Sequence, residues 1–301
     1  MASVLLIGLW MTCTSFITAA GLIYFLFPQL PQHFQDALLY GKTRGNRKEW
    51  SVIQLLEVPK RWFTHFYVVG FLVNGYMTYT VASIYFMGSE PPQQVGIIFN
   101  FLVDSHQIST TAVSALLVIF MMWLQNARRL AECYLVSVYS KSTINLAHYA
   151  MGILLYSTFS FAVLAESPSI FSYRVTNIQD ELSIQQLVGV LLFAWASFNH
   201  HKIHTQFARL RTDDKGKVKT LDHKIPTGGW FELVSCPHYF FEIVIYLSFI
   251  ITTGFDHKTL WVIVIFVLDN QIIAAFITHF WYLKTFKKYP AKRNAIIPYL
   301  L

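Results

Sequence analysis

Histidines, carboxylates and tyrosines gather in short segments of the carboxyl half of the sequence. The segment Asn199-His200-His201-Lys202-Ile203-His204 holds three histidines and is followed by Arg209 and Arg211. His200 and His204 would be neighbours on one helix face, a spacing that could hold a metal ion, but no HExxH pattern or carboxylate accompanies them. Basic and polar groups at a helix end more simply bind an anion such as phosphate, or meet lipid headgroups. We favour the anion site, and the other two interpretations stay open.

A second group follows a glycine-containing turn. In Ser235-Cys236-Pro237-His238-Tyr239-Phe240-Phe241-Glu242 the proline favours a helix start, so His238 and Glu242 would share one face at i, i+4 spacing. Just upstream, Ile225-Pro226-Thr227-Gly228-Gly229 lets the backbone come close to a ligand. The alternative for this segment is a tight turn that only feeds a helix.

The third group lies in the last long apolar segment. Asp269 and Asn270 precede His279 by two to three helical turns, and Tyr282 follows one turn after His279. These side chains can therefore line one groove that runs from mid-membrane to a membrane surface.

The composition shows which scaffold must position these groups. Of the 301 residues, 54% are hydrophobic and only 13% are charged, whereas soluble domains carry about 25% charged residues. A soluble, disordered or disulfide-framework protein is therefore excluded, and the three cysteines, Cys13, Cys133 and Cys236, have no CxxC spacing for zinc. The net charge of +7 does not indicate nucleic-acid binding, because in a membrane protein the placement of the basic residues decides its meaning.

Runs almost free of charged residues predict an all-α bundle of about seven transmembrane helices. Each run approaches or exceeds the roughly 20 residues that cross a bilayer. The runs cover about residues 1–35, 62–89, 97–124, 142–165, 182–201, 233–255 and 259–283. Asp104, Glu242 and Asp269 interrupt three of them, which makes them functional candidates, although Asp104 fits an interfacial or capping carboxylate better.

Lys and Arg residues alternate strongly between the two sides of this bundle. The connections between spans one and two, three and four, and five and six, together with the tail after span seven, carry nearly all of the 23 basic residues. Since cytoplasmic segments retain Lys and Arg, the N-terminus is expected on the lumenal side and the C-terminus in the cytoplasm. A heptahelical receptor or transporter would share this plan, so topology alone does not give the function.

Several motifs, taken together, resemble the steroid 5α-reductase family of membrane-bound, NADPH-dependent double-bond reductases. They are the IPxGG turn from Ile225, the His238-Tyr239 pair with Glu242, the HxxY pair of His279 and Tyr282, and the ending YPxxRxxIIPxL from Tyr289. In the amino half, DALLYGK, EVPKRWFTHFY and RRLAECYLVSVYS (residues 36–42, 57–67 and 128–140) are closest to the polyprenol reductase branch. The resemblance therefore covers most of the chain.

The resemblance implies a site for NADPH that opens to the cytosol. The matching positions are Arg129, Lys202, His204, Arg211, His223, Lys224, His238, Tyr239, Glu242, Asn270, His279 and Tyr282. The family's acidic residue in an [ED]xP element, which meets the polar end of the substrate, corresponds to Glu57. The tyrosine that steroid reductases place in an HY pair before the basic doublet is absent, and Gln125-Asn126 stands there.

The chemistry of hydride transfer restricts the substrate. Hydride attacks an electron-poor carbon, so the double bond must be conjugated to a carbonyl, and an isoprenoid substrate should react as polyprenal rather than polyprenol. Glu57, at the mouth of an apolar cavity, would stay protonated and donate a hydrogen bond to the carbonyl oxygen. A solvent-facing loop carboxylate before Pro59 is the alternative.

These observations predict one membrane reductase domain over residues 1–301, with a substrate side at about 1–165 and an NADPH side at about 182–301. It would reduce the α-isoprene double bond in dolichol synthesis for N-glycosylation, within the endoplasmic reticulum membrane, and could act as a monomer among membrane lipids. No metal and no nucleic acid are expected. A steroid 5α-reductase, a trans-2-enoyl-CoA reductase, a related methyltransferase, and a receptor or transporter are the alternatives.

Overall fold

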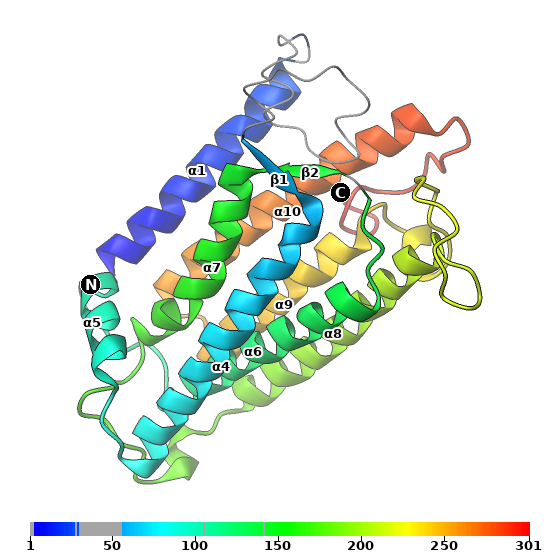
Figure 1. Ribbon diagram of the computed structural model, residues 1–301. Helices are drawn as coiled ribbons and strands as arrows, with labels where there is room; N and C mark the ends of the chain where they lie inside the picture. The colour runs from blue at the N-terminus through cyan, green and yellow to red at the C-terminus, as the bar shows by residue number, and fades with distance from the viewer. Residues whose placement is uncertain (1–2, 28, 30–55, 105, 141) are drawn as a thin grey trace.

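The computed structural model describes residues 3–27, 29, 56–104, 106–140 and 142–301 (Figure 1). Its described residues are mostly helical. The α-helices are α1 (Val4–Leu26), α4 (Phe63–Met87), α5 (Gln93–Leu102), α6 (Ala112–Leu135), α7 (Leu146–Leu164), α8 (Ile184–Arg209), α9 (Pro237–Thr253) and α10 (Lys258–Thr285). The DALLYGK segment and the basic residues between 42 and 48 lie outside the described residues.

Length and composition make three of the described helices, α1, α7 and α10, able to cross a membrane, and α9 is a shorter apolar helix. The expected run 97–124 is divided, because α5 ends at Leu102 and α6 begins at Ala112. Asp104 lies in this break, where its carboxylate accepts hydrogen bonds from the Ser3 hydroxyl (3.0 Å) and the Leu5 backbone N–H (3.4 Å). A carboxylate at a helix N-terminus is favourable, so the capping interpretation of Asp104 is confirmed.

Local sequence signals set where the key helices begin. Ser183 and Gln186 form a reciprocal capping box at the start of α8. Pro237 occupies the first turn of α9, where its missing N–H costs nothing. The polar segments of α8 and α9 lie side by side because these two helices pack against each other.

The remaining helices complete the bundle around this pair. The helix α4 packs against both α6 and α7, and α1 packs on α10 (Figure 1). Asp269 of α10 accepts a hydrogen bond from the Thr18 hydroxyl of α1 at 2.7 Å. Asp269 therefore joins two helices instead of lining the groove that the sequence suggested.

Short elements close the end of the bundle at which the C-terminus lies. Strand β1 (Glu57–Pro59) pairs antiparallel with β2 (Thr143–Asn145), with Glu57 opposite Asn145. The 3-10 turns η2 (Lys60–Trp62) and η4 (Gly229–Glu232) precede α4 and α9, whereas η3 (Ile178–Glu181) contacts the start of α6 at the other end, where Glu181 accepts a hydrogen bond from the Val113 N–H. The β1–β2 ribbon thus bridges the ends of α4 and α7 (Figure 1).

Candidate functional site

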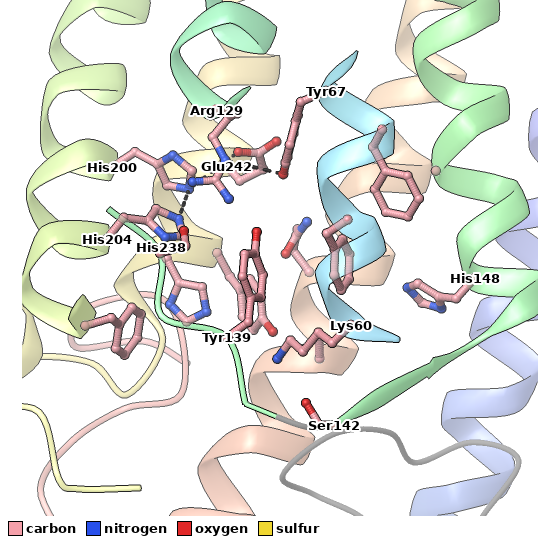
Figure 2. Close-up of a pocket in the computed structure, with 18 of the residues that line it drawn as sticks. Lys60, Tyr67, Arg129, Tyr139, Ser142, His148, His200, His204, His238 and Glu242 are labelled. Carbon is pink, nitrogen blue, oxygen red and sulfur yellow. Dashed lines mark hydrogen bonds and ion pairs between the residues drawn. The ribbon is translucent and has the colours of Figure 1, made fainter. Parts of the chain in front are cut away.

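A cavity of about 410 Å³ opens at this end of the bundle. Side chains of α4, α6, α7, α8, α9 and α10 line it, together with the segments that follow α6 and α8. Figure 2 shows His200, His204 and His238 on one side and Tyr67, Arg129 and Glu242 at one end. A concave site of this size with a few convergent polar groups is typical of ligand binding.

Most of the residues predicted to bind a cofactor come together here. The lining includes Arg129, His204, Arg211, His223, Lys224, His238, Tyr239, Glu242, Asn270 and Tyr282. Lys202 and His279 are not among the lining residues. The Lys202 ammonium lies over the Phe198 ring, 4.5 Å from its centroid, and His279 Nδ1 is 2.6 Å from the Ser235 hydroxyl.

One buried carboxylate organises the arginines of α6. Glu132 is 2% exposed and accepts hydrogen bonds from Arg128, Arg129 and His201. The contact with Arg128 Nη1 measures 2.5 Å and that with His201 Nδ1 measures 2.9 Å. Glu132 therefore holds the Arg129 guanidinium at the cavity wall, a role that no sequence motif indicated.

Glu242 joins α9 to this cluster. Its Oε2 accepts a hydrogen bond from Gln125 Nε2 at 3.1 Å and lies 3.6 Å from His200 Nε2. Gln125 in turn accepts from Arg128 Nη2 at 2.6 Å. The Gln125 side chain is thus oriented by the arginine and presents its amide to the Glu242 carboxylate.

The histidine pair has a defined proton arrangement. Arg128 Nη2 lies 2.9 Å from His200 Nδ1, and because a guanidinium can only donate, His200 Nδ1 is the acceptor. In the neutral imidazole the ring proton then sits on Nε2, which faces His204 Nε2 at 3.3 Å. The i, i+4 spacing predicted from the sequence is confirmed, and it places both rings in the cavity wall.

Three cations, Lys60, Arg211 and Lys224, line one part of the cavity, here called its mouth, and Asp222 lines the cavity as well. Arg211 Nη1 donates to the Val138 carbonyl at 2.7 Å. Burial lowers the pKa of the Lys60 ammonium, and the positive charge of Arg211 lowers it further. In the part of the chain that the structure describes, neither Lys60 nor Arg211 forms an ion pair with a carboxylate. The two positive charges together therefore favour a bound anion.

The turn that contains Gly228 and Gly229 is fastened from two sides. Both glycines have positive φ, +86° and +57°, which other residues rarely adopt. The Gly228 N–H donates to Glu232 at 2.6 Å, and Arg293 donates to the Pro226 carbonyl at 2.9 Å. These two hydrogen bonds hold the conformation of the turn, and one of them comes from Arg293 in the C-terminal segment.

The predicted acid, Glu57, lies in β1 and is half-buried. Its Oε2 accepts a hydrogen bond from the Thr143 hydroxyl of β2 at 2.6 Å. It is not among the lining residues of the cavity, whereas Lys60, three residues later, is. The catalytic role of Glu57 stays a prediction.

Four other lining residues were not predicted individually as site residues. Tyr67, Tyr156 and Tyr246 add phenols, and Lys60 adds a cation. Lys60 and Tyr67 could have been found, because both lie in the segment EVPKRWFTHFY that carries part of the resemblance. Tyr156 and Tyr246 are two tyrosines among 16, in a chain with 26 phenylalanines, and have no comparable signal.

Comparison with known proteins gives the family of this chain. The family model of the 3-oxo-5-alpha-steroid 4-dehydrogenases matches residues 142–301. A polyprenal reductase of Danio rerio is 38% identical over 277 residues, which cover 91% of this chain and 90% of that protein. Polyprenal reductases of Homo sapiens (34% identity; 97% and 95% covered) and Caenorhabditis elegans (38%; 87% and 85%) are similarly related. The chain belongs to the steroid 5α-reductase family.

Proposed function

We propose that this protein is an NADPH-dependent reductase that saturates the α,β double bond of polyprenal, a step toward dolichol for N-glycosylation. The observation that carries the proposal is one cavity with two unlike walls. Its α8 and α9 wall presents His200, His204, His238 and Glu242, and its mouth carries Arg211 and Lys224. Its α4, α7 and α10 wall has an apolar part, formed by Phe63, Phe66, Met151, Leu155, Phe266 and Val267, and also carries Asn270 and Gln271.

The residues at the mouth fit a nicotinamide dinucleotide phosphate. Phosphate oxygens need cationic and N–H donors, and Lys60, Arg211 and Lys224 supply cations in the lining of the cavity. A reduced nicotinamide, when bound, supplies hydride to the substrate. The protein's part is to orient the two reactants, exclude water and stabilise the oxygen on which charge develops.

The apolar wall fits an isoprenoid tail. Phe63 and Phe66 of α4, Met151 and Leu155 of α7, and Phe266 of α10 line it. A carbonyl placed near Arg129 and Glu242 would leave the tail beside these side chains. Burial of such a tail contributes about 0.8 kcal/mol per CH₂ group, which suits a long apolar substrate.

Membrane placement is part of the same proposal. The predicted seven spans would put the cavity mouth and the C-terminus in the cytoplasm, where NADPH is available, and the N-terminus in the lumen of the endoplasmic reticulum. The amino half to about residue 165 would then hold the substrate, and residues 182–301 would hold the nucleotide. The basic residues of the cytoplasmic connections support this orientation.

The test of the function is turnover by the purified protein. With NADPH, polyprenal should be reduced to dolichal, and polyprenol should not react in the absence of a dehydrogenase. A 3-oxo steroid and a trans-2-enoyl-CoA are the competing substrates. Faster turnover of either of these, or robust turnover of polyprenol, would overturn the proposal.

NADPH should bind more tightly than NADH. Arg211 and Lys224 can each form charge-assisted hydrogen bonds to the extra phosphate, which we expect to contribute about 1 to 3 kcal/mol. Titration of the purified protein with both nucleotides measures the difference, and Lys224→Gln should reduce it. Equal affinities would contradict the assignment of these residues.

Gly152 offers a way to test the tail site. A Cβ at this α7 position would lie 2.8 Å from a ring carbon of Phe66. Gly152→Leu must therefore narrow the cavity beside the apolar wall. We expect kcat/KM to fall at least about tenfold more for long-chain polyprenal than for a ten-carbon enal, because only the long chain needs the narrowed space. Gly8→Leu, where a Cβ meets nothing within 4 Å, is the control. Equal losses for both substrates would place the tail elsewhere.

A further inference from the structure

Tyr67 has an unusual position on the cavity wall. Its hydroxyl lies 3.3 Å from Arg129 Nε, which donates to it, and its ring packs against Tyr156 with centroids 5.6 Å apart (Figure 2). Because a guanidinium cannot accept a hydrogen bond, the proton of the Tyr67 hydroxyl is not used by this contact. Among the described residues, no acceptor receives that proton.

The neighbouring helix α6 offers no phenol of its own at the position where the steroid reductases have one. Asn126 of α6 stands where the steroid reductases have a tyrosine, and it is 0% exposed. A Cβ at Gly70 of α4 would lie 2.6 Å from Asn126 Oδ1, so Asn126 is pressed against α4 and is not among the lining residues. The close approach of α4 to α6 at Gly70, one turn after Tyr67, brings the Tyr67 phenol to Arg129.

Three other phenols of the cavity bond to groups that are not cations. The Tyr139 hydroxyl donates to the Cys133 sulfur at 3.0 Å. Tyr156 and Tyr246 share a hydrogen bond with each other. Tyr67 combines an available proton with a cation that can stabilise the phenolate left behind, since Arg129 is held by Glu132.

We propose that Tyr67 is a catalytic residue that donates its hydroxyl proton to the carbonyl oxygen of the α,β-unsaturated aldehyde. This inference rests on the proposed function. Hydride adds to the β carbon and the α,β π bond breaks. Its electron pair forms the bond between the α and carbonyl carbons, while the C=O π electrons move to oxygen. The Tyr67 proton forms the O–H bond of an enol, which becomes the saturated aldehyde when the α carbon takes a proton from water and the oxygen loses its own.

The nicotinamide is oxidised and the substrate is reduced by two electrons. The Tyr67 phenolate regains its proton when the enol oxygen loses one, so the net reaction consumes one hydride and one proton from water. Arg129 acts on this step by stabilising the phenolate through the hydrogen bond that already exists. Tyr67 and Arg129 thus form one donor unit contributed by two helices.

The experiment compares Tyr67→Phe with wild type in single-turnover reduction of polyprenal. Loss of one donor to a developing oxyanion should slow hydride transfer about 10²-fold, while NADPH affinity and the thermal midpoint stay unchanged. Tyr79→Phe, on the same helix but 71% exposed, should keep the wild-type rate. If wild type fails to reduce polyprenal, the proposed function is wrong. If wild type is active and folded Tyr67→Phe keeps more than half of its rate, the role of Tyr67 is wrong.

Discussion

Replacement of Glu132 by alanine is expected to destabilise the protein by about 3 to 5 kcal/mol. The carboxylate is 2% exposed and receives hydrogen bonds from Arg128, Arg129 and His201. Without it, two guanidinium groups that are only 20% and 12% exposed remain as like charges with no carboxylate between them. Removal of one partner of a buried ion pair costs more than the pair itself contributes, because the remaining charge stays desolvated.

Chemical unfolding in mixed detergent micelles measures this loss. Glu132→Gln preserves the shape and one acceptor, so it should lose less stability than Glu132→Ala. Glu90→Ala removes an exposed carboxylate and should stay within about 0.5 kcal/mol of wild type. A loss below about 1 kcal/mol for Glu132→Ala would mean that water already screens the two arginines.

The second large effect concerns turnover. If Glu57 activates the carbonyl, Glu57→Leu should lower kcat by about 10² to 10³-fold with near-normal NADPH binding. Glu57→Gln keeps a hydrogen-bond donor and should lose less. Stopped-flow measurement of NADPH oxidation with polyprenal gives the rate.

Thr143→Val separates catalysis from structure at Glu57. This variant removes the hydroxyl that donates to Glu57 at 2.6 Å but leaves the carboxyl in place. If Glu57 only holds β1 to β2, both variants should lose activity equally. A rate for Glu57→Leu close to wild type would remove Glu57 from the mechanism.

The sequence predicted the polar face of the carboxyl half well because its signals are local. His200 with His204, and His238 with Glu242, are four residues apart, and a helix places such pairs on one face without any knowledge of the fold. The uncharged runs located the long helices for the same reason. The run at 97–124 was the exception, because Asp104 lies in the break between α5 and α6 and caps the start of α1 instead of interrupting a span.

Long-range contacts could not be predicted in this way. Tyr67 and Arg129 are 62 residues apart, and Glu132 and His201 are 69 apart. Each contact depends on how α4 and α8 pack against α6, and the residue types alone fit many other partners. Asp269 shows the same limit, since its charge suggested a ligand site whereas its partner, Thr18, is on α1.

The hydrogen bond between Thr18 and Asp269 also bears on the order of assembly. It joins residues 251 positions apart, so α1 is synthesised long before the helix against which it packs. Until then the Thr18 hydroxyl can donate to the Thr14 carbonyl of its own helix, at 2.9 Å. A lone α1 in the bilayer therefore leaves no Thr18 hydrogen-bond donor unsatisfied. Asp269 has no such local substitute, and a lone carboxylate in lipid is costly. Packing of α1 on α10 therefore satisfies the Asp269 carboxylate with a partner that α10 itself does not supply.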